Sequence, residues 1–444
     1  MILTFLGAGS TVFVRNILSD LFLTPSLRDA EVHLYDIDER RLQASVEIIS
    51  MLNTRINGGA VLIRAYAGEQ RRREALRGSD FVINAIQVGG YEPATVIDFE
   101  LPAKYGLRQT IGDTLGIGGI FRGIRTLQVM FGIVREMEEE CPKALLLNYV
   151  NPLAIVTGGI MKYSDIKTVG LCHSVQVCVP RLLEYTGIDL DPAEVRWRIA
   201  GINHMAWLLE LSHEGRDLYP EIKRRAADLR DHSDRVRFEL MKRFGYYVTE
   251  SSEHNAEYTP YWIKKSHPEL IDEYHIPLDE YPRRCREQIE EWERDRAEAL
   301  QLRVEGGGEK KSEQGPEMSK EYAALIMDSV ETGTVRRIHG NVLNTGLIQN
   351  LPNEAVVEVP CLVDRNGIQG VYVGRLPTQC AALNSAAVHM QLMTIEAALS
   401  GSREALYQAA FLDPHTAAEL TIDEIVALCD EMLSAHGDYC RIIQ

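Results

Sequence analysis

The chain has 444 residues, of which 45% are hydrophobic and 25% are charged, as is typical of a globular protein with a sizeable core. Its 47 basic and 64 acidic residues give a formal net charge of −17. This charge argues against nucleic acid or an anionic membrane as a partner, since both need a basic face. No apolar run approaches the roughly 20 residues of a membrane span. The eight cysteines form no CxxC pair and the first residues lack the basic segment of a signal peptide, so we expect a cytoplasmic protein.

Up to about residue 200, short apolar runs alternate with segments whose apolar residues recur at helical spacing. The pattern predicts strands at residues 2–6, 32–35, 61–65, 81–85 and 144–149, and helices at 13–23, 39–52 and 120–138. Strands that alternate with helices form a parallel sheet with right-handed crossovers. We therefore predict an α/β fold that begins with a Rossmann-type parallel sheet in a domain over residues 1–200.

After residue 200 the pattern changes to a mixture of helices and strands. It predicts a strand at 206–211, charged helix-rich stretches at 221–244 and 279–305, helices at 319–330 and 377–400, and a β-rich section at 355–372. The polar, glycine-rich residues 305–316 predict a surface loop. Residues 201–444 are thus expected to form an α+β portion that completes the active site.

A glycine turn separates the first predicted strand from the first predicted helix. In Gly7-Ala8-Gly9-Ser10-Thr11 the glycines allow a tight turn and let backbone N–H groups approach a pyrophosphate at the positive end of a helix. Val12 replaces the third glycine of the usual G-x-G-x-x-G, so a purely structural turn with a helix-capping Asp36 is the alternative. Asp36 ends the second strand, where its carboxylate can accept both ribose hydroxyls and would repel a 2′-phosphate. The segment 84–90, with small residues at a strand end, suits the nicotinamide ribose. The predicted cofactor is NAD, held by Gly7, Gly9, Ser10, Thr11, Asp36, Asn84 and Gln87.

Three polar stretches, at 148–152, 171–175 and 201–205, lie where a doubly wound sheet binds its ligand. Among them Cys172 and His204 offer a thiolate and an imidazole, which suit a divalent ion such as Mn²⁺, Co²⁺ or Ni²⁺. Two protein ligands would leave positions open for substrate hydroxyls, as a catalytic ion requires. From spacing alone, a lone cysteine such as Cys172 is more often a small core residue than a metal ligand.

Taken together, the motifs resemble those of glycoside hydrolase family 4, the NAD- and divalent-metal-dependent glycosidases, over nearly the whole chain. The sequence Cys172-His173-Ser174-Val175 is similar to that of the family's α-galactosidase (melibiase) type subgroup, and it argues against a 6-phosphorylated sugar. The motifs that carry the resemblance are Gly7–Thr11, Asn84–Gly90, Gly112–Arg122, Asn148–Pro152, Cys172–Val175, Gly201–His204, Asn341–Gly346, Asn350–Pro352 and Val357–Pro360.

This resemblance implies hydrolysis of an unphosphorylated α-galactoside by an internal redox route, with NAD and Mn²⁺ or another divalent ion as cofactors. Hydride leaves C3 of the sugar for NAD⁺, the ion assists deprotonation at C2, and the glycosidic oxygen leaves by 1,2-elimination. Water then adds to C1 and the hydride returns. An α-galacturonide or an α-glucoside is the alternative substrate. A homo-oligomer, dimer or tetramer, is expected, with substrate binding, metal binding and oligomerisation assigned to residues 201–444.

The resemblance also suggests roles for individual residues. Cys172 and His204 would ligate the metal, and His173 would be the acid that assists the leaving group. The base would be Tyr258, with His254 as the alternative. The sugar hydroxyls would contact Asp113, Asn148 and Asn151, with Arg122, Asn344 and Asn384 as lesser candidates.

Two rival hypotheses share the predicted Rossmann-type domain. An NAD-dependent 2-hydroxy acid dehydrogenase would need a catalytic arginine and a His-Asp pair but no metal, so the pair Cys172 and His204 argues against it. A non-catalytic NAD-responsive binding protein would bind the cofactor without metal dependence or turnover.

Overall fold

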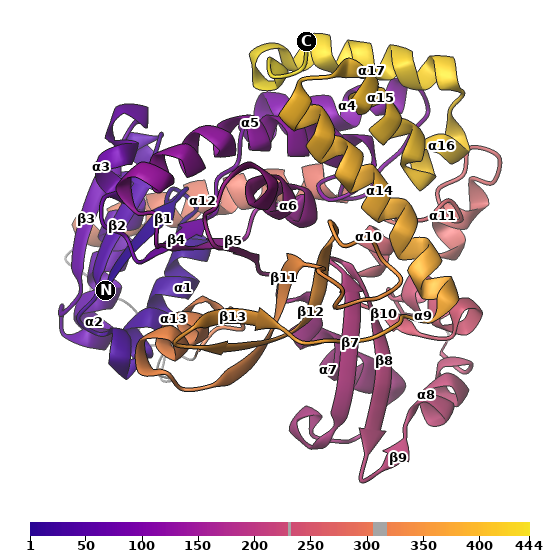
Figure 1. Cartoon of the computed structure of the whole chain (residues 1–444), viewed down its shortest axis with the longest axis horizontal. Helices are drawn as coiled ribbons and strands as arrows, with labels where there is room; N and C mark the ends of the chain where they lie inside the picture. Colours follow the sequence, from indigo (N-terminus) through magenta and orange to yellow (C-terminus); the bar gives the residue numbers. More distant parts are fainter. Residues whose placement is uncertain (230–231, 305–317) are drawn as a thin grey trace.

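The computed structural model describes residues 1–229, 232–304 and 318–444, so the predicted loop at 305–316 lies outside the described residues. In the described part, thirteen strands form one mixed sheet around which the helices pack (Figure 1). The strands are β1 (Ile2–Leu6), β2 (Glu31–Asp36), β3 (Leu62–Ala67), β4 (Phe81–Asn84), β5 (Leu145–Asn148), β6 (Thr168–Gly170), β7 (Arg196–Ile202), β8 (Met205–His213), β9 (Arg216–Asp217), β10 (Tyr247–Val248), β11 (Arg336–Leu343), β12 (Val356–Asp364) and β13 (Gly367–Gly370).

The first six strands are parallel and lie in the order β3-β2-β1-β4-β5-β6. This order is that of a Rossmann sheet, whose ligand site lies beyond the carboxyl ends of the strands where the order reverses. The predicted α/β fold is therefore confirmed. The five strands predicted in this half are β1 to β5. The three-residue β6 was not predicted, because it is too short to show a periodic pattern.

Helices cover both faces of the parallel half. Figure 1 shows α1, α2 and α13 below it and α3, α5 and α6 above it. The helices are α1 (Thr11–Leu23), α2 (Glu39–Asn57), α3 (Arg72–Leu76), α4 (Val96–Lys104), α5 (Gly116–Glu140), α6 (Leu153–Tyr163), α7 (Ser174–Thr186), α8 (Tyr219–Ala226), α9 (Arg235–Phe244), α10 (Ser252–Glu257), α11 (Glu269–Glu273), α12 (Glu280–Val304), α13 (Ala323–Thr332), α14 (Thr378–Ser400), α15 (Arg403–Leu412), α16 (Pro414–Glu419) and α17 (Ile422–His436).

Alternate side chains of a strand enter opposite core layers, because successive side chains of a strand point to opposite faces. Phe81 and Ile83 of β4 join the apolar cluster that contains Ile17 of α1. Val82 joins the cluster that contains Met130 of α5. Apolar residues therefore occupy every position of β4 except its carboxyl end, where Asn84 stands.

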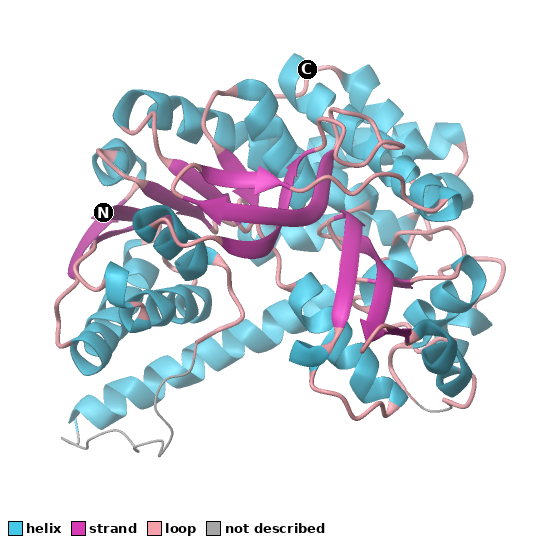
Figure 2. Ribbon diagram, turned by 60° about the horizontal axis from the view of Figure 1, so that its bottom comes forward, coloured by secondary structure: helices cyan, strands magenta, loops and turns pink. Residues whose placement is uncertain are grey.

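Antiparallel strands extend the sheet beyond β6, in the order β11-β12-β7-β8-β10. Figure 2 shows them turning steeply away from the parallel strands. The predicted β-rich section contains β12 and β13, and the predicted helices after residue 318 are α13 and α14. The division at residue 200 stays a prediction. Strand β7 spans this position, and the sheet is continuous across it.

Helix α5 is long and apolar enough to cross a membrane by length and composition alone. In the structure, 83% of its most apolar window is buried inside the protein, and it packs against α3, α4, α6 and α14. It is therefore a core helix of this fold.

Candidate functional site: a dinucleotide turn beside a cysteine, histidine and glutamate cluster

The glycine turn after β1 lies close to the carboxylate of Asp36. Gly9 N donates a hydrogen bond of 2.7 Å to Asp36 Oδ2, and a Cβ at Gly9 would lie 2.8 Å from that oxygen. Gly7 has a φ of +83°, and a Cβ there would lie 2.5 Å from Ala85 O. Both positions therefore require glycine. The alternative that Asp36 caps a helix is wrong, since the cap of α2 is Asp38, which accepts from Arg41 N at 3.0 Å.

The surroundings of this turn fit a dinucleotide. Val12, near the start of α1, and Ile37, directly after Asp36, are 59% and 69% exposed, so both present apolar surface to solvent. The Oδ1 atom of Asn84 is buried and has no partner among the described residues. Ser10 and Gln87 are exposed near the same strand ends, while the side chain of Thr11 lies outside the described residues. The predicted cofactor residues that are described thus line one end of the sheet.

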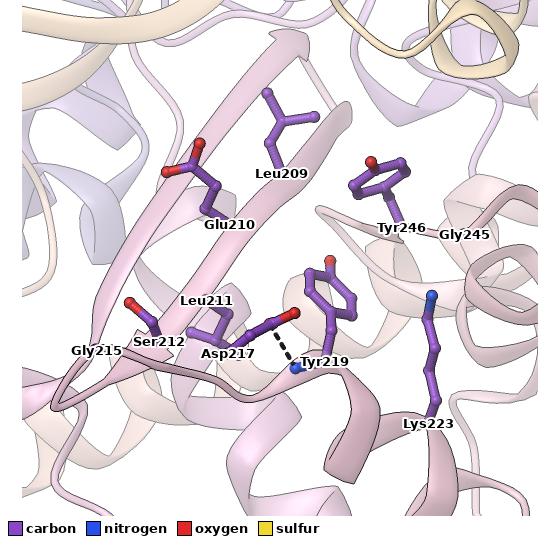
Figure 3. Close-up of a pocket in the computed structure, with 10 residues that line it drawn as sticks. All are labelled: Leu209, Glu210, Leu211, Ser212, Gly215, Asp217, Tyr219, Lys223, Gly245 and Tyr246. Carbon is purple, nitrogen blue, oxygen red and sulfur yellow. Dashed lines mark hydrogen bonds between the residues drawn. The ribbon is translucent and has the colours of Figure 1, made fainter.

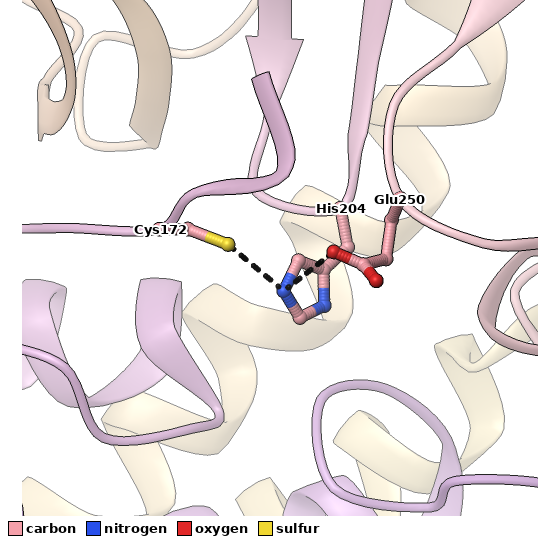
Figure 4. Close-up of side chains that lie close together, drawn as sticks. All are labelled: Cys172, His204 and Glu250. Atoms are coloured by element: carbon pink, nitrogen blue, oxygen red, sulfur yellow. Dashed lines mark hydrogen bonds and ion pairs between the residues drawn. The ribbon is translucent and has the colours of Figure 1, made fainter. Parts of the chain in front are cut away.

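Three side chains from separate segments converge beside this end of the sheet (Figure 4). Cys172 follows β6, His204 lies in the turn between β7 and β8, and Glu250 follows β10. His204 Nε2 lies 3.5 Å from Cys172 Sγ and 3.6 Å from Glu250 Oε2. The potential ligand atoms of the three residues all lie within 4.8 Å of one another. The structure therefore brings the two predicted metal ligands together and adds a carboxylate.

His204 is held so that only Nε2 faces the cluster. Its Nδ1 lies 3.1 Å from Tyr258 Oη and 3.2 Å from Thr114 Oγ1, and the residue is 3% exposed. Its φ of +64° is in the left-handed region, which is uncommon for a residue with a side chain and occurs often at functional sites. Hydrogen bonds to the far ring nitrogen commonly fix the orientation and tautomer of a metal-binding histidine.

The chemistry of the three donors fits a divalent transition-metal ion. Burial opposes ionisation of Glu250, but His254, His204 and His173 bring the pKa of its carboxyl to about 2. Burial raises the pKa of the Cys172 thiol to about 12. Metal ions bind the thiolate form of cysteine and not the thiol. An ion that enters this site would therefore displace the proton of Cys172.

Two of the predicted sugar ligands adjoin this cluster. Asp113 Oδ2 accepts a hydrogen bond of 3.0 Å from Asn151 Nδ2, and Oδ1 accepts one of 2.7 Å from Thr114, the residue that also contacts His204. Burial opposes ionisation of Asp113, but Arg122, His254 and His204 hold its pKa below the usual range. Arg122 Nε donates to Asn151 O at 3.1 Å. Asp113 is therefore a fixed anionic acceptor next to the candidate ion.

Three asparagines that were predicted to contact the sugar form hydrogen bonds within the protein. Asn148 is fully buried; its Oδ1 accepts from Asn84 Nδ2 at 2.9 Å, and its Nδ2 donates to Thr157 Oγ1 at 3.0 Å. Asn344 donates to three main-chain carbonyls of its own loop. Asn384 accepts from the Trp207 indole at 3.1 Å. These amides fix strand ends and loops, and a sugar contact by Asn148 stays a prediction.

The predicted acid, His173, lies immediately before α7 with its side chain 58% exposed. Its Nδ1 is 3.6 Å from Glu321 Oε1. The interaction with Glu321 raises the pKa of His173 to about 9, so the imidazole carries a proton at neutral pH.

The two predicted bases differ in their placement. Tyr258 is 1% exposed, its hydroxyl faces His204 Nδ1, and burial raises its pKa well above the usual range. The ring of His254 lies 4.9 Å from that of His204, and its Nδ1 lies 2.8 Å from Ser251 Oγ. Burial lowers the pKa of His254, so its imidazole is neutral near pH 7.

Sequence reasoning missed two glutamates near these residues. Both Glu250 and Glu257 lie in the polar stretch 250–258, which also contains the two predicted bases. Glu257 accepts hydrogen bonds from the backbone N–H groups of Thr110 and Gly112, at 2.8 and 2.9 Å. It thereby holds the loop that presents Asp113. Acidic residues in that stretch were the available signal.

A separate hollow of about 450 Å³ lies on the outer part of β8, β9 and α8 (Figure 3). The rings of Tyr219 and Tyr246 and the charged side chains of Glu210, Asp217 and Lys223 line it. Its β8 residues lie at the opposite end of that strand from His204. It contains none of the predicted site residues.

Comparison with known proteins agrees with this geometry. The family model described as family 4 glycosyl hydrolase matches residues 2–188, and that of the family 4 glycosyl hydrolase C-terminal domain matches residues 199–416. An α-galactosidase of Bacillus subtilis (strain 168) is 55% identical over 98% of both chains. An α-galactosidase of Rhizobium meliloti (strain 1021) is 33% identical over 98% of this chain and 88% of its own.

Solved structures share the fold. The Bacillus subtilis protein lplD has a TM-score of 0.82 at 26% identity and covers 98% of this chain and 99% of its own. A 6-phospho-α-glucosidase from gut microorganisms, in complex with NAD and Mn²⁺, has a TM-score of 0.79 at 21% identity, with 100% and 99% of the two chains covered. The matched families cover most of the chain and decide against the rival dehydrogenase hypothesis. The chain belongs to family 4 of the glycosyl hydrolases.

Proposed function

We propose that this chain is an NAD- and divalent-metal-dependent α-galactosidase acting on an unphosphorylated sugar. The observation that carries the proposal is the 55% identity, over 98% of both chains, to a protein named α-galactosidase. Relatives named α-galacturonidase or α-glucosidase are 27–29% identical, which makes their substrates the alternatives. The Cys172–Val175 sequence, which resembles that of the α-galactosidase subgroup, supports the same choice.

The residues of the site support specific roles. NAD and the ion, when bound, supply a hydride acceptor and a Lewis acid. Cys172 and His204 hold the ion, and Asp36 holds the adenosine ribose. Asp113 accepts hydrogen bonds from the sugar hydroxyls and fixes the sugar against the ion, with Asn151 orienting the carboxylate.

Proton transfers are assigned to two histidines. His173 is exposed and protonated at neutral pH, so it delivers a proton to the departing glycosidic oxygen. His254 is neutral and lies beside His204, so it accepts the C2 proton. Tyr258 acts through its hydrogen bond to His204 and serves as a positioning residue.

We also propose that the enzyme is a cytoplasmic homo-oligomer, dimer or tetramer, with a small sugar as substrate and neither nucleic acid nor a membrane as partner. All eight cysteines are free thiols, which suits a reducing compartment. The net charge of −17 opposes binding to other polyanions.

Hydrolysis of nitrophenyl glycosides tests the proposal. After removal of bound cofactors, the α-galactoside should be cleaved only when NAD⁺ and Mn²⁺ are both supplied, and Cys172→Ser should be inactive yet retain NAD⁺ binding. Faster cleavage of the α-galacturonide or the α-glucoside would replace the assigned substrate. Full activity after chelation would remove the metal from the proposal.

A further inference from the structure

The carboxylate of Glu250 lies beside the proposed metal site without a hydrogen-bonding partner of its own. Within residues 1–229, 232–304 and 318–444, neither of its oxygens accepts a hydrogen bond. Its nearest basic neighbours are the imidazole nitrogens His204 Nε2 and His254 Nδ1, each at 3.6 Å. The side chain is 20% exposed, so most of a charged group is removed from water. Such a group normally needs a paired cation or a metal ion.

The separations in the cluster match ligands of a single ion. Donor atoms bound at about 2.1 and 2.3 Å lie roughly 3.1–3.6 Å apart when the angle at the metal is between a right angle and a tetrahedral angle. The distance from His204 Nε2 to Cys172 Sγ, 3.5 Å, lies in this range. A nitrogen and an oxygen that are both bound at about 2.1 Å lie roughly 3.0–3.4 Å apart at the same angles, and the 3.6 Å between His204 Nε2 and Glu250 Oε2 is slightly longer. Cys172 and Glu250 therefore each lie close to the distance from His204 that two ligands of one ion would have.

The backbone also supports the placement of this side chain. Glu250 has a φ of +66°, a conformation uncommon for residues with a side chain. It lies two residues after the end of the short strand β10, which pairs with β8, and β8 begins at the residue after His204. The sheet thus fixes Glu250 relative to the turn that presents His204 (Figure 4).

We propose that Glu250 is a third protein ligand of the catalytic ion, an inference that rests on the proposed metal-dependent function. A carboxylate added to a thiolate and an imidazole gives the set a hard ligand suited to Mn²⁺. It also brings a second negative charge to the site. Three protein ligands leave positions open for substrate hydroxyls and water.

Direct titration of the protein with Mn²⁺, followed by electron paramagnetic resonance of the free ion, tests this inference without relying on activity. Changes to groups behind metal ligands typically cost 10–100-fold in metal affinity, so loss of a ligand in Glu250→Gln should cost at least about 100-fold. Glu250→Asp, which keeps the carboxylate on a shorter stem, should bind more tightly than Glu250→Gln. The matched control is Glu253→Gln. Glu253 is a nearby glutamate whose side chain is 22% exposed and pairs with Arg284, so its variant removes the same charge and should bind Mn²⁺ almost as wild type does.

NAD⁺ affinity serves as the check that each variant is folded. Co²⁺ loaded in place of Mn²⁺ should show altered visible absorption bands in Glu250→Gln but not in Glu253→Gln, because these bands report the ligands of the ion. Wild-type Mn²⁺ affinity in Glu250→Gln, with binding lost in Cys172→Ser, would overturn the inference and leave the proposed function intact. Wild-type affinity combined with loss of C2 proton exchange would also overturn it, and would assign Glu250 to proton transfer. Failure of the wild type to bind Mn²⁺ would overturn the metal-dependent function itself.

Discussion

Each carboxylate oxygen of Asp36 accepts a hydrogen bond from a backbone N–H group, one in the glycine turn and the other in the loop that follows β2. Its Oδ2 accepts from Gly9 N at 2.7 Å, and its Oδ1 accepts from Asp38 N at 2.8 Å. Both oxygens therefore have fixed directions before any ligand arrives. A preorganised acceptor loses little conformational entropy when a ribose hydroxyl binds to it.

Replacement of Asp36 tests the choice of cofactor. Asp36→Ala should weaken NAD⁺ binding, since each charge-assisted hydrogen bond contributes about 1.5–3 kcal/mol, or roughly 10- to 150-fold in affinity. Asp36→Asn, which keeps the shape but loses the charge, should reduce discrimination against NADP⁺. Isothermal titration of both dinucleotides measures these effects. Equal affinity of the wild type for NAD⁺ and NADP⁺ would contradict the assignment.

The raised pKa of His173 predicts the pH at which activity is lost on the basic side of the pH–rate profile. The contact with Glu321 raises the pKa of His173 to about 9, so the acid is protonated below that pH and is lost as the pH rises through it. Plots of kcat/KM against pH should therefore fall above about pH 9. Glu321→Gln removes the main cause of the raised pKa and should move this limb toward the ordinary histidine value of 6.5.

Leaving-group dependence supplies the control for this assignment. His173→Ala should slow alkyl galactosides more than nitrophenyl galactosides, because a nitrophenolate leaves without protonation. An unchanged basic limb in both His173→Ala and Glu321→Gln would show that another group titrates there.

Prediction of the site from sequence depended on where each residue lies along the chain. Cys172 and His204 could be found because each lies in a short polar motif, Cys172–Val175 and Gly201–His204, that resembles a motif of the family. Glu250 follows a strand of only two residues, β10, and no local pattern marks such a strand. The hydrogen bonds of Asn148 within the protein could not be predicted for a related reason. A strand-end amide can face the cleft or a neighbouring strand, and only the packing of β4 against β5 shows which.

At the scale of elements, a buried cluster of Arg125, Asp98 and His436 connects helices α4, α5 and α17 with the segment after β4. Arg125 of α5 donates from Nη1 and Nη2 to the two carboxylate oxygens of Asp98 in α4, at 3.0 and 2.6 Å. Asp98 also lies 2.9 Å from His436 Nε2 at the end of α17. Arg125 Nε donates to Val88 O at 3.2 Å. The segment after β4 that is expected to contact the nicotinamide is therefore supported from behind by this group.

Removal of Arg125 should be strongly destabilising. Arg125→Met leaves Asp98 buried with only His436 as a partner, and breaking a buried ion pair typically costs about 3–5 kcal/mol. The free energy of unfolding from urea titrations measures the loss. Arg73→Ala, which breaks an exposed pair with Glu139, should cost only about 0–1 kcal/mol. A loss of similar size in both variants would show that the buried group contributes no more than a surface pair.

Helices and strands were predictable in proportion to their length and periodicity. The parallel half alternates clear strand and helix patterns, and its five longest strands were predicted. Helix α6 was not predicted, because it is buried almost all round and shows no polar face. Strands β7 and β11 carry the polar residues Arg196, Arg198, Arg336 and Arg337, which obscure an apolar pattern.

At the scale of the whole molecule, one continuous sheet carries both the glycine turn and the cluster of Cys172, His204 and Glu250. The turn follows β1 in the parallel half, whereas His204 and Glu250 come from the antiparallel strands. Continuity of the sheet through β6, β11, β12 and β7 fixes one half against the other. The sugar must lie where both halves reach it, because a bound nicotinamide would accept the hydride and an ion held by Cys172 and His204 would act as a Lewis acid.

This arrangement predicts the fate of two hydrogen atoms of the sugar. When an α-galactoside is hydrolysed in D₂O, the product should carry deuterium at C2, because the base that removes the C2 proton exchanges with water before it returns one. C3 should keep its own hydrogen, since the hydride is carried away and back on the nicotinamide without meeting solvent. Proton NMR of the released galactose measures both positions. Deuteration of the substrate at C2 should also slow turnover wherever deprotonation limits the rate.

The variant His254→Ala, which removes the proposed base, should abolish the C2 exchange while leaving NAD⁺ binding unchanged. Product without deuterium at C2, together with unchanged rates for C2- and C3-deuterated substrates, would exclude elimination. The enzyme would then need the pair of acidic side chains that conventional glycosidases place across the scissile bond, and Asp113 and Glu250 would be the carboxylates to examine for that role.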